Sequence, residues 1–112
     1  MIKFEKRGNL EITSFTINKI NAFVSDKIKS EIVKEFENSG TNMIIDLKGV
    51  EYIDSTGFAC FLSVLKAAKN NYGVLKFANA EPSVLALFET LHLHTVFEIY
   101  KDIDSGIRSF NK

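Results

Sequence analysis

The sequence contains a single cysteine, Cys60, which lies inside an apolar run. One thiol cannot build a disulfide framework, and it cannot supply the several thiolates of a cysteine-rich metal cluster. This scarcity of cysteine is typical of a protein from a reducing compartment. We therefore expect a cytoplasmic protein with no bound metal or other cofactor.

The chain also lacks an excess of charge, because 14 Lys and Arg residues balance 14 Asp and Glu residues. No overall electric field therefore favours nucleic acid or an anionic membrane as the partner. We expect any partner to be recognised by a local surface, without direct contact to nucleic acid.

Long apolar runs are absent as well. Apolar residues never approach the roughly 18 consecutive positions of a membrane span, and the start, MIKFEKRGNL, lacks the apolar stretch of a signal peptide. No repeat or linker-like segment divides the chain. We predict an unexported protein without a membrane span, folded as one domain over residues 1–112. Such a chain buries one core but cannot form the deep two-domain cleft of many enzymes.

The hydrophobic pattern of the first half predicts strands and a helix. Alternating apolar and polar residues on either side of Gly8 and Asn9 indicate a hairpin of two antiparallel strands. An apolar stripe at four-residue intervals indicates an amphipathic helix from about Ala22 to Asn38. Residues 42–47 are rich in isoleucine, which is typical of a strand covered on both faces.

The second half continues with helices and strands in turn. The predicted elements are a largely buried helix from Ser55 or Thr56 to about Lys69, a strand at 74–79, a helix with Pro82 in its first turn, a strand at 96–100 and a weak helix over 102–110. This order favours an α/β sandwich, with a mixed central sheet of about five strands and helices packed mainly on one face.

The most polar tetrapeptide, Asp54-Ser55-Thr56-Gly57, lies between two apolar runs at a predicted helix start. A Ser or Thr there can cap the helix by accepting a backbone hydrogen bond, and a nearby Asp complements the positive helix end. Capping alone can therefore account for the motif.

Enzymatic use of these residues lacks positive evidence. The tetrapeptide has one hydroxyl residue more than the aspartic-protease signature, and Ser55 is not flanked by the glycines of a serine-hydrolase elbow. His92 and His94 would share one face of a strand as metal ligands, but no third ligand follows at a recognisable spacing. Polar residues are also simply favourable after a helix end. We expect no enzymatic activity and no metal site.

Ser55 can instead receive chemistry from another protein. A phosphate on its hydroxyl adds a charge of about −1.5 to −2 at the positive end of a helix, where backbone amides tolerate it without unfolding. Asp54 repels this phosphate, and a partner packed on the loop must desolvate the dianion or leave. Such a switch acts at an interface.

The segment NMIIDLKGVEYIDSTGF resembles the central segment of STAS domains, specifically those of bacterial anti-sigma factor antagonists. The resemblance continues through VLKFAN and PSVLALFETLHLHTVFEIY and covers roughly residues 41–110. It implies a STAS-like fold and a non-enzymatic protein that binds an anti-sigma factor, which is also a serine kinase. That kinase phosphorylates the serine after the motif's Asp and thereby releases the antagonist, and a serine phosphatase restores it.

By position, the resemblance implies that Ser55 is the phosphoacceptor. Asp54, Thr56 and Gly57, with the following Phe58, form the partner-binding loop around it. The family often has a Gly-x-Leu-Asp pattern before the first helix, and Asn21 occupies the place of that Asp. Asn21 is therefore a candidate contact for the partner or the kinase.

Two phenylalanines follow Ser55 where the family commonly has small residues. Phe58 and Phe61 are interpreted as core residues, which their helical spacing favours, with an exposed partner anchor as the alternative.

Two further classes of function stand beside this interpretation. A STAS-like scaffold subunit of a lipid-transport or stress-signalling complex would use the same loop without phosphorylation. A phosphoacceptor domain of the response-regulator type is suggested by MIIDL, but that fold needs an acidic pair after its first strand to hold magnesium, and LEITSFTIN has none.

Overall fold

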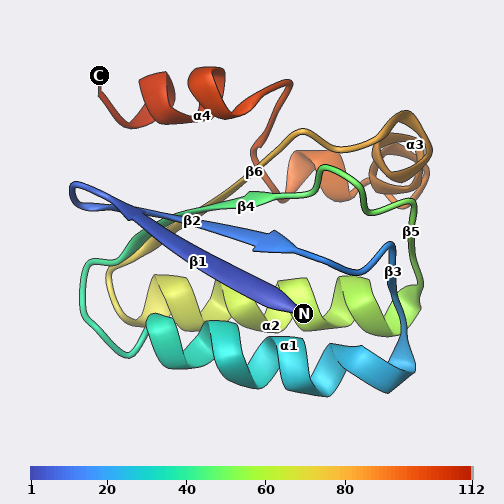
Figure 1. Ribbon diagram of the computed structural model, residues 1–112, viewed down its shortest axis with the longest axis horizontal. Helices are drawn as coiled ribbons and strands as arrows, with labels where there is room; N and C mark the ends of the chain where they lie inside the picture. The colour runs from blue at the N-terminus through green and yellow to red at the C-terminus, as the bar shows by residue number, and fades with distance from the viewer. Residues whose placement is uncertain (112) are drawn as a thin grey trace.

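The computed structural model describes residues 1–111, and Lys112 lies outside this range. Its central sheet has five strands in the order β1-β2-β4-β6-β7 (Figure 1). The strands are Ile2–Arg7 (β1), Leu10–Phe15 (β2), Asn42–Asp46 (β4), Val74–Ala78 (β6) and Ile99–Tyr100 (β7). β1 is antiparallel to β2, whereas all other neighbours in the sheet are parallel. The predicted mixed sheet of five strands is confirmed.

Helices cover both faces of this sheet unequally. In the described range they are α1 (Ala22–Glu35), α2 (Ser55–Asn70), α3 (Pro82–Thr90) and α4 (Ile103–Phe110). α1 and α2 lie along one face, and α4 lies on the other (Figure 1). α3 adds Val84 and Phe88 to the core on the α1 and α2 side. Helix packing is therefore mainly on one face, as predicted. None of these helices is long and apolar enough to cross a lipid bilayer.

The hairpin forms the edge of the sheet. Gly8 adopts the left-handed backbone conformation, with φ of 63°, that the turn between β1 and β2 requires. β1 is mostly exposed and carries the charged residues Lys3, Glu5, Lys6 and Arg7. Charged side chains on an edge strand discourage pairing with a second chain, so the exposed β1 does not invite aggregation.

The isoleucine-rich strand β4 lies at the centre of the sheet. Met43 and Ile45 face the larger core between the sheet and helices α1 and α2, and Ile44 faces the smaller core between the sheet and α4. Both faces are therefore buried, which explains why the apolar run in β4 is continuous rather than alternating.

Two predicted elements are shorter than expected. The first helix ends at Glu35 instead of Asn38, and the buried Phe36 forms its carboxyl-terminal cap. The predicted strand at 96–100 pairs with β6 only at β7, because Phe97 turns inward and its ring lies 5.0 Å from that of Phe77. Helical periodicity and alternation cannot show where a buried aromatic ring redirects the backbone.

Candidate functional site

A short pair of strands brings the starts of α1 and α2 together. β3 (Lys19–Ile20) and β5 (Tyr52–Ile53) pair in parallel, and each is two residues long. Asn21 and Asp54 follow these strands directly and begin α1 and α2. The two helices therefore start at the same end of the molecule (Figure 1). This pair was not predicted, since two residues are too few to show a strand pattern.

Asp54 caps α2. Its Oδ1 accepts hydrogen bonds from the backbone N–H groups of Thr56 and Gly57, at 2.9 and 3.1 Å, and from the hydroxyl of Thr56. The Thr56 hydroxyl, then the backbone amides of Gly57, Thr56 and Ala22, lower the pKa of Asp54 below its ordinary value. The carboxylate is therefore negative at neutral pH and stabilises the start of α2. The expectation that Ser or Thr supplies the cap is wrong, because Asp54 does so.

Ser55 is the first residue of α2, and it is exposed. Within residues 1–111 its hydroxyl makes no hydrogen bond, whereas the hydroxyl of Thr56 donates to Asp54. The two neighbouring hydroxyls therefore differ in character. The Ser55 hydroxyl is available to a partner protein, whereas the Thr56 hydroxyl is already hydrogen-bonded to Asp54.

Gly57 lies inside the first turn of α2, against the β3–β5 pair. A Cβ at this position would lie 2.6 Å from Cγ2 of Ile53 and 2.9 Å from Cγ2 of Ile20. These distances are too short for two carbon atoms, so only glycine lets the helix start this close to the strands. Gly57 therefore serves close packing rather than the turn into the helix.

Phe58 does not belong to the exposed part of the loop. It is 4% exposed, and its ring meets the edge of the Phe88 ring with centroids 5.1 Å apart. Phe61 is fully buried in the same core. The placement of the Phe58 side chain in the partner-binding loop is thus corrected, and the core interpretation of both residues is confirmed.

Asn21 caps α1 as Asp54 caps α2. Its Oδ1 accepts a hydrogen bond from the backbone N–H of Phe23 at 3.0 Å. Asn and Asp are nearly equivalent as helix caps. The neutral amide of Asn21 therefore preserves the cap, but it lacks the negative charge that an Asp at this position would place beside Asp54. The structure brings Asn21 close to the tetrapeptide, since the backbone N–H of Asp54 donates to the carbonyl group of Ile20, the residue before Asn21, at 3.0 Å.

Phe23 is a residue of this corner that sequence reasoning missed. It is 96% exposed, although it is a large aromatic residue in the first turn of α1. The apolar stripe of α1 begins at Val24, and a rotation of about 100° per residue turns Phe23 away from that stripe. The position of Phe23 outside this stripe is the sequence feature that could have indicated its exposure. Tyr52, in β5, is a second half-exposed aromatic residue near the same corner.

Other chemically capable residues do not form a site. Burial raises the pKa of the Cys60 thiol to about 12, so this thiol stays protonated and unreactive. His92 and His94 are exposed around a turn of 3-10 helix at Leu93–Thr95, not in a strand. Within the described residues no group of three or more His, Cys, Asp or Glu side chains is placed to hold a metal ion.

The family model described as STAS domain matches residues 3–106. The chain therefore belongs to the STAS domain family. It is 26% identical to the anti-sigma-B factor antagonist of Listeria monocytogenes over 110 residues, which cover 98% of this chain and 96% of the relative. It is also 26% identical to the anti-sigma-B factor antagonist of Bacillus subtilis, over 92% of this chain and 94% of the relative.

The fold matches that of the anti-sigma factor antagonist SpoIIAA. Its unphosphorylated form has a TM-score of 0.82 at 14% identity, covering 99% of this chain and 96% of that chain. Its phosphorylated form, from Bacillus, has a TM-score of 0.73 at 13% identity, covering 98% and 99%.

Replacing Gly57 by alanine tests the close contact between α2 and the short strand pair. We expect Gly57→Ala to lower the free energy of unfolding by about 1–3 kcal/mol, because the added methyl group must push β3 or β5 away. Urea unfolding followed by circular dichroism measures this change. Ser55→Ala, an exposed change in the same turn, is the control and is expected to stay within about 0.5 kcal/mol. Equal stability of both variants would show that the contact is not tight.

Proposed function

We propose that this protein is a phosphorylation-switched anti-sigma factor antagonist. As a single domain in the cytoplasm, it binds an anti-sigma factor that is also a serine kinase while Ser55 is unphosphorylated. Phosphorylation of Ser55 ends binding, and a serine phosphatase restores it. The observation that carries the proposal is the free, exposed hydroxyl of Ser55 at the start of α2. It is supported by relatives that are anti-sigma factor antagonists and by a fold neighbour, SpoIIAA, that exists in a phosphorylated form.

A phosphate on Ser55 finds little compensation within the domain. The amides of Thr56 and Gly57, which would otherwise attract an anion at a helix start, already donate to Asp54. The neighbouring Asp54 carboxylate is negative and repels the phosphate. The modified residue therefore keeps its charge in solvent, and the fold has no reason to rearrange.

Phosphorylation therefore weakens the complex with the partner and does not destabilise the free domain. A partner packed on Ser55 has to remove water from a dianion that lies beside another negative charge. A desolvation penalty of about 3 kcal/mol corresponds to a loss of affinity of roughly a hundredfold. The same free hydroxyl thus serves as a contact in one state and as a repulsive charge in the other.

A scaffold subunit that binds its partner without phosphorylation is the second candidate. Asn21 favours it, because this residue puts a neutral amide where many family members carry a carboxylate. Asn21 caps α1 under both candidate functions. Its difference from the family's carboxylate therefore affects recognition of a partner and not the fold. Phosphorylation of Ser55 separates the two candidates.

Phosphorylation by a serine kinase of the anti-sigma type from the same genome tests the switch. After incubation with ATP we expect one phosphate, on Ser55, by mass spectrometry, and none on Ser55→Ala. The phosphorylated protein and Ser55→Asp should bind that kinase more weakly, by roughly a hundredfold for the phosphoprotein. Ser63→Ala, which changes another hydroxyl of α2, is the matched control and should behave as the unmodified chain does. Phosphate on Thr56 or Ser63 by an active kinase would rule the proposal out.

Phe23 extends the proposed contact surface beyond the tetrapeptide. An aromatic ring that is 96% exposed gains from entering an apolar pocket of a partner, and such rings often dominate binding energy. Phe23 lies in the first turn of α1, which begins beside the start of α2 because β3 pairs with β5, so we include the ring in the surface that a partner seated on Ser55 contacts.

Replacing Phe23 by alanine tests this extension. We expect Phe23→Ala to weaken binding of the anti-sigma kinase by about 30-fold, the effect of a contact worth about 2 kcal/mol. Stability should stay within about 0.5 kcal/mol because the ring buries almost nothing in the free protein. Tyr72→Ala, which removes another exposed ring (86% exposed) after the far end of α2, is the control and should leave affinity unchanged. Equal affinity of both variants would remove Phe23 from the interface.

A further inference from the structure

The connection between β4 and β5 leads directly into the corner that presents Ser55. Residues 47–51 contain no helix or strand, and Gly49 takes the left-handed backbone conformation, with φ of 86°. The side chains of Leu47 and Val50 are buried, whereas the turn between them is exposed. An exposed turn moves readily unless other parts of the chain hold its backbone. The hydrogen-bond partners of this connection therefore decide how firmly the corner is placed.

The start of α3 holds the connection at two points. The Oε2 atom of Glu81 accepts a hydrogen bond from the backbone N–H of Gly49 at 2.8 Å. The hydroxyl of Ser83 donates to the backbone carbonyl group of Glu51 at 2.9 Å. Each bond joins residues 32 positions apart in the sequence, so α3 acts on the connection from outside it.

Glu81 serves this contact rather than the start of its own helix. It occupies the N-cap position of α3, yet its side chain makes no capping hydrogen bond. The residues that cap helices well are Ser, Thr, Asp and Asn, and Glu is not among them. Pro82 in the first turn has no N–H group to satisfy, so α3 has less need of a cap. The carboxylate of Glu81 is therefore free to bind Gly49.

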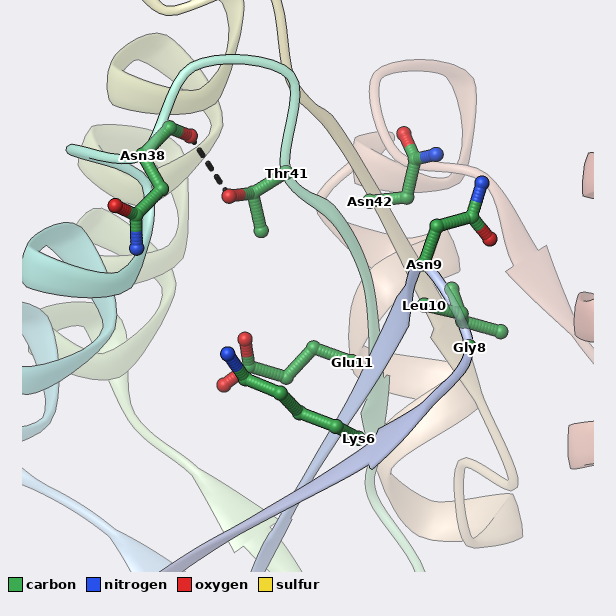
Figure 2. A pocket seen from close by; sticks show the side chains of 8 residues that line it. All are labelled: Lys6, Gly8, Asn9, Leu10, Glu11, Asn38, Thr41 and Asn42. Carbon is green, nitrogen blue, oxygen red and sulfur yellow. Dashed lines mark hydrogen bonds between the residues drawn. The ribbon is translucent and has the colours of Figure 1, made fainter.

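The connection at the opposite end of β4 is held differently. There the hydroxyl of Thr41 donates to the carbonyl groups of Asn38 and Glu35, at 2.7 and 3.2 Å, and the first of these bonds is drawn in Figure 2. That connection is held by a side chain of its own, whereas the connection to β5 depends on a distant helix. Thr41 therefore offers a matched control for Glu81.

Hydrogen bonds continue from the β4–β5 connection to the Ser55 corner. The carbonyl group of Asn18 accepts from the N–H groups of Glu51 and Tyr52, at 2.7 and 3.3 Å. β5 then pairs with β3, and the N–H of Asp54 donates to the carbonyl group of Ile20 at 3.0 Å. Glu51 is thus bonded to α3 and to Asn18 shortly before the cap of α2.

α3 also contacts the chain after Ser55. The ring of Phe88 on α3 packs against the ring of Phe58 near the start of α2, with centroids 5.1 Å apart, and both side chains are buried. The stretch from Gly49 to Phe58 is therefore held by α3 both before and after Ser55 in the sequence.

We propose that Glu81 and Ser83 are positioning residues for Ser55. By fixing the backbone at Gly49 and Glu51, they set where β5 ends and where the Ser55 hydroxyl is presented to a kinase. Neither residue contacts the kinase in this role. The effect on phosphorylation rests on the function proposed above, whereas the effect on the β4–β5 connection does not.

Phosphoryl transfer is sensitive to such positioning, because the accepting hydroxyl has to lie in line with the transferred phosphate. A displacement of about 1 Å can slow a reaction by roughly a hundredfold, and loss of one of two hydrogen bonds should cause part of that effect. We expect Glu81→Ala to lower kcat for phosphorylation of Ser55 by about tenfold and to leave KM within about twofold, because the surface that the kinase contacts is unchanged. Ser83→Ala should act in the same direction.

Hydrogen exchange of the unphosphorylated protein, followed by NMR, tests the positioning directly. In Glu81→Ala the amides of Gly49 and Asp54 should exchange about tenfold faster, whereas Ile45 in β4 should keep its rate. Glu81→Gln retains an acceptor oxygen on a side chain of the same length, so its exchange and its kcat should stay close to those of the unmodified protein. Thr41→Val removes side-chain hydrogen bonds from the other connection and should change neither the exchange at Asp54 nor kcat.

Two results would overturn the positioning role. The first is normal exchange at Gly49 and Asp54 in Glu81→Ala, or a normal kcat for this variant where the unmodified protein is phosphorylated. The second is faster exchange throughout the domain, including Ile45, which would assign Glu81 to global stability. If an active kinase fails to phosphorylate the unmodified protein, the proposed function is rejected, and the exchange of Glu81→Ala still decides whether Glu81 holds the connection.

Discussion

The carboxylate of Asp54 is the contact on which the candidate site depends. One oxygen accepts from Thr56 and Gly57 at the start of α2, and the backbone N–H of Asp54 donates to the carbonyl group of Ile20, just before the start of α1. The two helices therefore begin at one corner. Because Asp54 occupies the amides and the Thr56 hydroxyl, Ser55 is left with an unengaged hydroxyl. The capping interaction and the proposed switch thus use adjacent atoms without competing for them.

The packing below this corner makes it rigid. Gly57 lets α2 approach Ile20 and Ile53, and Phe58 points directly into the aromatic core against Phe88. A loop fixed in this way presents Ser55 in one position. Such preorganisation reduces the entropy lost when a partner binds, and it leaves the charge of a phosphate as the main change between the two states. The exposed Phe23 adds an apolar contact beside that charge.

Sequence patterns predicted the fold and the position of the site, but not the assignment of each side chain. The continuous apolar run of β4 and the stripe of α2 indicate burial directly. Alternation around Gly8 and Asn9 predicted a hairpin, but it did not show that both faces of β2 are buried, as they are at Leu10, Glu11, Ile12 and Thr13. Position within a motif shows neither that Asp54 rather than Ser55 caps α2 nor that Gly57 serves packing. These assignments depend on the β3–β5 pair, which joins residues about thirty positions apart.

The NMR spectrum of the protein phosphorylated at Ser55 tests the central claim most directly. We predict that amide shifts change only around Ser55 and the start of α1, and that the amides of Thr56 and Gly57 remain protected from hydrogen exchange by Asp54. Shifts spread through β4 and β6, or loss of protection at Thr56 and Gly57, would contradict it. Phosphorylation would then act by remodelling the domain and not by placing a charge at an interface.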